Sequence, residues 1–361
     1  MRSSVRRSST ARKLFPALTL LLALSSIGGV RAAELCWPEG ALAYQQGEEK
    51  IRRTAGPVVV PPRDTGARLQ SAAASLPVGA IRRVELPPKS RKLIALTFDL
   101  CEQPREIAGY QGGIVDFLRA QGVKATFFAG GKWLMTHPQR AQQLMSDPLF
   151  EIGNHSWDHR NLRMANGEEL TRSIGAPQAA YRQLRDDLET RQCRRPGDSV
   201  AAHRHAAGEI ALFRFPYGAC DAKSLEAVAA RGLTPIQWDV AAGDPSQSAT
   251  APLMIAEVVS RVRPGSIVIF HANGRGWHTP EALPEIVARL KQRGYEFATV
   301  GELLKAGRPV IEPRCYNARP GDTDRYDVAL KRRAPQPERV QKQRPGVTPP
   351  PAAWDTIMEA Q

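Results

Sequence analysis

The 361 residues suffice for one large domain with tails or for two ordinary domains, and 42% hydrophobic with 24% charged residues is typical of a globular chain. Fibrous and wholly disordered proteins are thereby excluded. Basic residues outnumber acidic ones by 50 to 36, but residues 1–32 hold six basic residues and no acidic one, which leaves 44 to 36. This excess suits contact with anionic surfaces but lacks the dense basic face of a nucleic-acid-binding protein, so we expect no nucleic-acid partner.

The first 32 residues have the three parts of a secretory signal peptide. Residues 2–13 are basic, residues 14–30 are an apolar run, and Val30-Arg31-Ala32 puts small residues at positions −3 and −1 before Ala33. An uncleaved membrane anchor is the alternative, but the run contains Pro16 and is shorter than the roughly 20 apolar residues that span a bilayer. We therefore expect an exported chain, periplasmic or secreted, that is not an integral membrane protein after cleavage.

The next region, residues 33–90, shows little periodicity and contains several prolines, which predicts an irregular N-terminal arm. Short apolar stretches then alternate with amphipathic ones. We predict buried strands at residues 93–98, 125–129, 151–154, 211–215, 233–238, 266–270 and 296–300. We predict helices at residues 107–120, 133–146, 168–190, 221–231, 252–262, 281–293 and 301–306.

This alternation predicts an α/β fold, in which helices cover a parallel sheet. With right-handed crossovers, such a chain closes into a barrel or stays open and doubly wound, and periodicity does not choose between them. Residues 307–361 are basic and proline-rich, so we predict a largely disordered C-terminal extension. It is either a solvated end or a segment that binds an anionic polymer of the cell envelope.

Polar side chains follow the predicted strands at their carboxyl ends, where the site of a β/α fold forms. His155 and His159 are four residues apart, so on a helical turn both imidazoles could bind one divalent metal. Asp99 follows a neighbouring strand and could be the base that deprotonates a water, or simply a helix cap before Pro104. His271 could be the acid that protonates a leaving amine, or a buried core histidine.

Two further charged residues fit the same arrangement. Arg214 is expected to pair with a carboxylate of the site, because a guanidinium makes bidentate bonds of fixed geometry; a surface ion pair is the alternative. Asp244 could orient His271 and raise its pKa.

With these residues, the sequence resembles the polysaccharide deacetylases of carbohydrate esterase family 4, the NodB-homology group, and we place that domain at residues 91–306. Five short motifs occur in the order of the family. They are Thr97-Phe98-Asp99, His155-Ser156-Trp157-Asp158-His159, Arg214-Phe215-Pro216-Tyr217, the stretch from Trp238 to Asp244, and Ile269-Phe270-His271. The resemblance implies a distorted (β/α) barrel of about seven parallel strands that removes N-acetyl, or sometimes O-acetyl, groups from an acetylated glycan.

The resemblance also implies roles. Asp99 would be the base, His271 the acid, and the backbone amide of Tyr217 a donor to the oxyanion. The metal would be zinc, with cobalt, nickel or manganese as alternatives, held by His155 and His159. The substrate side would be formed by Phe215, Pro216, Trp238 and Asp239.

The sequence departs from the family at residue 100. The family usually has a second aspartate there as the third metal ligand, and this chain has Leu100. Either Glu102 reaches the ion, or Asp99 itself binds it, or two histidines and water hold the metal. The expected function is thus metal-dependent deacetylation, with a carbohydrate-binding pseudoenzyme and an amidase for a small non-sugar amide as alternatives.

The five cysteines are an odd number, so at least one is unpaired or bonded between molecules. Cys101 and Cys220 follow the first and third motifs, on loops expected at the same barrel face. We predict that they form a disulfide and that Cys36 and Cys315 join the two arms.

Overall fold

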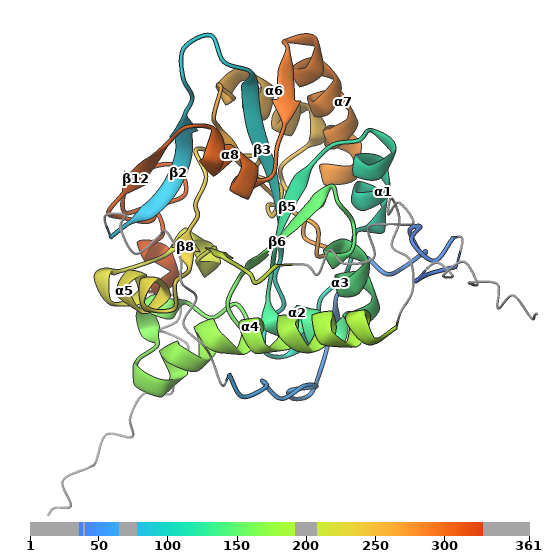
Figure 1. The fold of residues 1–361 in the computed structure, drawn as a ribbon, viewed down its shortest axis with the longest axis vertical. Helices are drawn as coiled ribbons and strands as arrows, with labels where there is room; N and C mark the ends of the chain where they lie inside the picture. Colours follow the sequence, from blue (N-terminus) through green and yellow to red (C-terminus); the bar gives the residue numbers. More distant parts are fainter. Residues whose placement is uncertain (1–35, 39, 65–77, 192–207, 328–361) are drawn as a thin grey trace, which may run out of the picture.

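The structure is a computed structural model that describes residues 36–38, 40–64, 78–191 and 208–327 (Figure 1). The expected signal peptide and the tail from residue 328 onward lie outside these ranges, so cleavage and polymer binding remain predictions. Within the described ranges, none of the helices combines the length and apolar character that crossing a bilayer requires.

A curled parallel sheet forms the centre of the molecule. Its strands run in the order β8-β7-β6-β5-β3-β10-β9, and β11 (Tyr295–Phe297) also pairs in parallel with β3. Their bounds are β3 Lys92–Leu100, β5 Ala125–Ala129, β6 Phe150–Asn154, β7 Leu212–Phe213, β8 Thr234–Pro235, β9 Val240–Ala241 and β10 Ile267–His271. All seven predicted strands are present, and the predicted distorted barrel is confirmed.

Strand β2 (Ala80–Glu85) lies across the gap between the two ends of this sheet. Ile81 bridges to Ile236 just after β8, and Arg83 bridges to Ser266 just before β10. On its other side β2 pairs antiparallel with β12 (Arg308–Glu312). The barrel is therefore closed by a strand that precedes it in the sequence.

Helices surround the sheet, and α4 runs past α2 and α3 along one side (Figure 1). The helices are α1 Gly112–Ala120, α2 Gly131–Thr136, α3 Pro138–Met145, α4 Gly167–Thr190, α5 Ala222–Ala230, α6 Ala251–Arg261, α7 Thr279–Gln292 and α8 Val300–Ala306. Capping boxes begin α5 and α8. Each predicted helix is found, although the stretch predicted at residues 133–146 is divided between α2 and α3 because Pro138 starts a new helix.

The two-residue period of β3 positions the site. Phe98 and Leu100 belong to the main hydrophobic core cluster. Thr97 and Asp99 face the other way, and both accept hydrogen bonds from the guanidinium of Arg214. The polar side chains of β3 therefore point into the barrel interior, and its apolar side chains pack against the surrounding helices.

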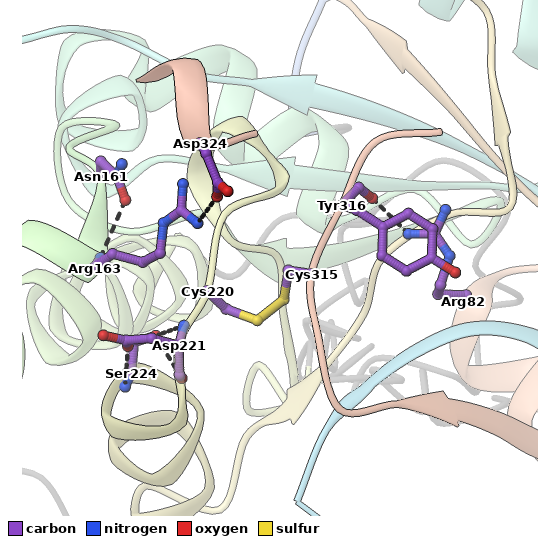
Figure 2. The surroundings of a disulfide bond; sticks show 9 residues. All are labelled: Arg82, Asn161, Arg163, Cys220, Asp221, Ser224, Cys315, Tyr316 and Asp324. Carbon is purple, nitrogen blue, oxygen red and sulfur yellow. Dashed lines mark hydrogen bonds and ion pairs between the residues drawn. A yellow bond between two sulfur atoms is a disulfide. The ribbon is translucent and has the colours of Figure 1, made fainter. Parts of the chain in front are cut away.

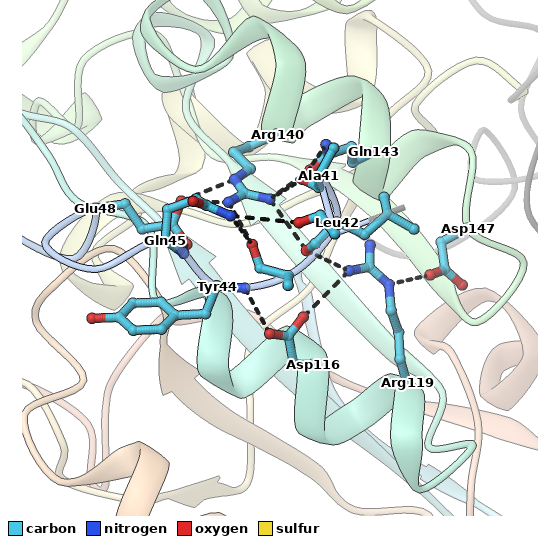
Figure 3. Close-up of polar contacts among 12 residues, drawn as sticks. Ala41, Leu42, Tyr44, Gln45, Glu48, Asp116, Arg119, Arg140, Gln143 and Asp147 are labelled. Atoms are coloured by element: carbon cyan, nitrogen blue, oxygen red, sulfur yellow. Dashed lines mark hydrogen bonds and ion pairs between the residues drawn. The ribbon is translucent and has the colours of Figure 1, made fainter. Parts of the chain in front are cut away.

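The N-terminal arm is tied to the body by buried polar contacts (Figure 3). Arg140 of α3 donates to the carbonyl oxygens of Ala41, Leu42 and Ala43 and to the carboxylate of Glu48. Farther along the arm, β1 (Arg52–Arg53) pairs with β4 (Glu106–Ile107). The described part of the arm therefore wraps the body.

Besides the two-residue strands β1, β4 and β9, two longer strands lie where none was predicted. β2 falls within the region expected to be an irregular arm, and β12 falls within the extension expected to be largely disordered. In β2, Arg82 interrupts the apolar pattern but is buried because its guanidinium lies 3.7 Å from the ring centre of Tyr316. In β12, apolar and polar residues alternate over only a few positions. The strand pairs with β2, which is far away in the chain.

Replacing Arg140 with alanine is expected to lower the free energy of unfolding by about 3–5 kcal/mol, because it removes the part-buried ion pair with Glu48 and the hydrogen bonds to three carbonyl oxygens of the arm. Chemical denaturation would measure the change. Arg289→Ala, which removes an exposed ion pair with Glu285 on α7, is the control and should cost at most about 0.5 kcal/mol. Equal losses for both variants would contradict a structural role for the Arg140 contacts.

Candidate active site

A pocket of about 430 Å³ opens where the parallel strands end. Asp99 and His271 line it from β3 and β10, where they are register partners. Other predicted residues on its wall are His159, Tyr217, Trp238 and Asp244. The topology thus brings together residues that are up to 172 positions apart.

Asp99 and Arg214 form a buried ion pair. Arg214 Nη1 donates to Asp99 Oδ1 at 2.8 Å, and the two residues are 0% and 3% exposed. Burial favours a neutral carboxyl, but the neighbouring His155 ring, the Arg214 guanidinium and the His271 ring together lower the pKa of Asp99. The Asp99 carboxylate is therefore ionised and able to accept a proton.

His271 is held by Asp244. Its Nδ1 lies 2.9 Å from Asp244 Oδ1, and Thr279 donates to the other carboxylate oxygen at 2.8 Å. Burial lowers the pKa of a histidine, yet the Asp244 charge outweighs this and raises the pKa of His271 above its ordinary value. His271 is thus suited to carry a proton that it can donate.

His155 and His159 approach each other with ring centres 5.0 Å apart. They do not lie on a helical turn as predicted, because Ser156 and His159 have positive φ angles of 64° and 57°. His155 Nδ1 lies 2.9 Å from the carbonyl oxygen of Arg214, which leaves the lone pair on Nε2. Burial lowers the pKa of His155 and lowers that of His159 well below the ordinary value, so both rings are neutral.

The donor set fits a divalent metal. The buried atoms His155 Nε2 and His159 Nδ1 have no hydrogen-bond partner among the described residues, and neutral imidazole nitrogens are ordinary zinc ligands. Ligand atoms of His155, His159 and Cys101 all lie within 4.8 Å of one another. Such a metal site would have a cysteine where the sequence led us to expect a carboxylate.

Glu102, one of the three alternatives for holding the metal that the sequence left open, does not lie with this group. Its carboxylate lies 3.1 Å from Lys132 Nζ and accepts hydrogen bonds from Ala108 N and Thr136 Oγ1. Leu100 and Glu102 are two residues apart, so their side chains point to the same side of the chain, away from the site. Asp99 and Cys101 point to the other side, into the site, and this alternation is the sequence signal that could have indicated Cys101.

The expected substrate residues divide into two groups. Trp238 lines the pocket, but Phe215 is fully buried in a core cluster and, like Pro216, is not part of the pocket wall. Asp239 accepts bonds from Ile267 N and Ser266 Oγ and so connects the sheet rather than facing the pocket. These residues were predicted from their place in the family motifs. Successive side chains of an extended chain point to opposite sides, so only some of the side chains in a motif face the pocket.

Tyr217 has a φ of 61° inside the short 3₁₀ helix η3 (Pro216–Gly218). This sharp turn brings its ring against His159, at 4.5 Å between ring centres, and against Tyr326, at 4.8 Å. Tyr217 therefore lies between the histidines and the C-terminal segment. The oxyanion contact predicted for Tyr217 belongs to its backbone amide and remains a prediction.

The C-terminal segment, residues 313–327, forms one wall of the pocket through Asn317, Arg325 and Tyr326. Figure 2 shows its attachment: Cys315 is bonded to Cys220, and Asp324 accepts from Arg163 at 2.9 Å. The predicted Cys101–Cys220 and Cys36–Cys315 bonds are therefore wrong, and Cys101 is a free thiol. Cys220 turns toward the C-terminal segment and packs with Cys315 in one core cluster, away from Cys101.

Residues 87–236 match the sequence model of the Polysaccharide deacetylase family. A peptidoglycan-N-acetylglucosamine deacetylase of Listeria monocytogenes is 29% identical over 225 residues, which is 62% of this chain but only 41% of the Listeria protein. A chitooligosaccharide deacetylase of Azorhizobium caulinodans is 28% identical over 221 residues, 57% of this chain and 92% of the relative.

Among solved structures, a pseudoenzyme of carbohydrate esterase family 4 from Bacillus anthracis superposes with a TM-score of 0.51 at 22% identity, covering 64% of this chain and 71% of the other. Identity this low supports the fold alone. Residues 87–236, which the family model matches, therefore share the sequence pattern and the fold of polysaccharide deacetylase domains. The central sheet continues past the matched residues through β9, β10 and β11.

The Cys220–Cys315 bond closes a long loop, since the two cysteines are 95 residues apart. Replacing both with alanine is expected to lower the free energy of unfolding by roughly 3–5 kcal/mol in denaturant titrations. Asn317→Ala removes only the 3.1 Å contact with Trp238 Nε1, so it should alter the pocket wall at a cost of about 1 kcal/mol. A double variant as stable as the parent chain would show that the bond does not anchor the segment.

Asp244→Asn keeps the shape of the side chain but removes the charge that raises the pKa of His271. An acid must be protonated to act, so loss of this charge moves the alkaline limb of the kcat/KM profile to lower pH. Thr279→Val, which removes a hydrogen bond and leaves the charge, is the control and should move that limb less. An unchanged alkaline limb in Asp244→Asn would exclude this pair as its origin.

Proposed function

We propose that this chain is an exported, metal-dependent deacetylase that hydrolyses acetamido groups on an acetylated cell-surface glycan. The observation that carries the proposal is the pairing of an ionised Asp99 with a His271 of raised pKa in one pocket. Beside them, His155 Nε2 and His159 Nδ1 have no hydrogen-bond partner among the described residues, and His155 Nε2 lies 3.4 Å from Asp99 Oδ2. The names of the Listeria and Azorhizobium relatives support an N-acetylglucosamine polymer as the substrate. The leader-like residues 1–32 support export.

Asp99 acts as the base in this reaction. Arg214 holds Asp99 Oδ1, which leaves Oδ2 to accept a proton from a water that attacks the acetyl carbonyl carbon. The water oxygen forms a bond to that carbon, and the carbonyl becomes a tetrahedral oxyanion. Arg214 keeps the carboxylate ionised and correctly oriented through the step.

His271 acts as the acid. It donates a proton to the sugar nitrogen as the carbon–nitrogen bond breaks, so that acetate and a free amine are the products. Asp244 stabilises the protonated ring before the transfer. A divalent ion held by His155, His159 and a third side chain would supply Lewis-acid polarisation of the substrate carbonyl and the attacking water.

The pocket wall is compatible with a sugar substrate. Trp238 and Tyr217 contribute aromatic rings to the wall and Arg325 contributes a guanidinium, while Arg275 is paired with Glu106. Aromatic rings pack well on the apolar faces of sugars, and cationic groups attract an anionic polymer. A carbohydrate-binding pseudoenzyme would use the same wall but would release no acetate.

Acetate release from a panel of N-acetylated glycans should require added zinc or cobalt and should stop with a chelator. Asp99→Asn is expected to lower kcat by about 10²–10⁴-fold, because the amide accepts no proton. Glu281→Gln, an exposed carboxylate on α7, is the control and should leave the rate unchanged. Sugar binding without release under any metal would favour the pseudoenzyme, and release from a small amide alone would favour the amidase.

A further inference from the structure

The end of β3 brings a thiol to the metal-binding part of the site. Cys101 follows Thr97 and Asp99 at two-residue intervals, is 3% exposed, and is the free thiol among the described cysteines. Leu100 packs into the core on the opposite face, so it is not a vacant ligand position within the site. Cys101, one residue after Leu100, is the side chain that faces the two histidines.

The distances suit a shared ion. The ligand atoms of Cys101, His155 and His159 lie within 4.8 Å of one another. Zinc bonds of about 2.3 Å to sulfur and about 2.0–2.1 Å to nitrogen put tetrahedral ligand atoms roughly 3.3–3.6 Å apart. No pair would have to close by more than about 1.5 Å, which side-chain rotation can supply.

The surrounding contacts are those of a ligand set. His155 Nε2 and His159 Nδ1 are buried without a hydrogen-bond partner among the described residues, while the carbonyl of Arg214 fixes the tautomer of His155. Asn273 Nδ2 lies 2.9 Å from Cys101 Sγ and donates to it. This donor lowers the pKa of the thiol, but burial raises it to about 12, so Cys101 would lose its proton only as it binds a metal.

We propose that the Cys101 thiolate, with His155 and His159, completes a Cys-His-His site for a thiophilic divalent cation, an inference that rests on the metal dependence proposed above. On binding, the thiol proton passes to solvent as the sulfur–metal bond forms, and no electron is transferred. A soft sulfur ligand favours zinc and cobalt over magnesium and manganese. Three protein ligands leave a position open for water or substrate.

Cobalt substitution tests the ligand directly. The full chain, stripped of metal with a chelator, is titrated with Co²⁺, and sulfur-to-cobalt charge-transfer absorption is recorded in the near ultraviolet. We expect a band that saturates at about one equivalent in the parent chain and is absent in Cys101→Ser. Zinc affinity of Cys101→Ser, measured by competition with a chromophoric chelator, should fall by about 100-fold or more. The proposal would be overturned if the parent chain showed no such band, or if Cys101→Ser bound zinc as tightly as the parent chain.

Two matched variants separate the candidate ligands. Cys101→Asp should restore much of the zinc affinity without the band, because it returns a carboxylate to the site. Glu102→Gln should keep both the band and the affinity, since Glu102 contacts Lys132 and Thr136 instead. If Glu102→Gln lost the band while unfolding at the same temperature as the parent chain, the assignment of Cys101 as the ligand would be contradicted.

Alkylation of the unmutated chain provides a measurement that does not depend on variant folding. Under conditions in which the metal-free chain is labelled at Cys101, zinc should slow iodoacetamide labelling, read by mass spectrometry, whereas magnesium should not. Equal labelling with and without zinc under those conditions would overturn the proposal. Zinc binding through Cys101 without acetate release would uphold this site and reject the deacetylase. Metal-dependent acetate release, together with a zinc affinity of Cys101→Ser equal to that of the parent chain, would uphold the deacetylase and reject this site.

Discussion

The buried pair of Asp99 and Arg214 is the interaction on which the site depends. A guanidinium that is 0% exposed is costly to desolvate, and the barrel offsets the cost with the Asp99 carboxylate, the Thr97 hydroxyl and the ring of Phe128, whose centre is 4.0 Å away. Arg214 also accepts through its carbonyl the contact that fixes His155. Removing either charge would leave the other uncompensated, so the base, its orientation and the histidine tautomer are set together.

A second constraint comes from closure of the barrel by distant parts of the chain. β2 lies between β8 and β10, and β12 pairs with β2 before the chain reaches Cys315. Arg82 of β2 donates to the carbonyl oxygens of Tyr316 and Asn317 and so holds the segment that follows. The pocket therefore has a wall formed by Asn317, Arg325 and Tyr326, which lie outside residues 87–236 that the family model matches.

Much of the fold and of the catalytic pair was predictable from the sequence. The strands β3, β5, β6 and β10 are apolar runs buried on both faces, and such runs between amphipathic helices define a parallel α/β sheet. Asp99, His155, His271 and Asp244 were identifiable because they follow these runs, where parallel strands present their ends together. β2 and β12 were missed because their alternation is short and includes charged residues whose burial depends on partners far away in the chain.

The sequence by itself determined the element order, the polar groups at the strand ends and the absence of a second aspartate at position 100, because all three follow from local periodicity and residue identity. Only the tertiary structure decided which side chains share a face and which cysteines meet. Glu102 and Cys101 are neighbours in the chain, yet one contacts Lys132 and the other faces His155 and His159. The alternation of side chains at the end of β3 separates them, and no composition or spacing rule fixes where that alternation stops.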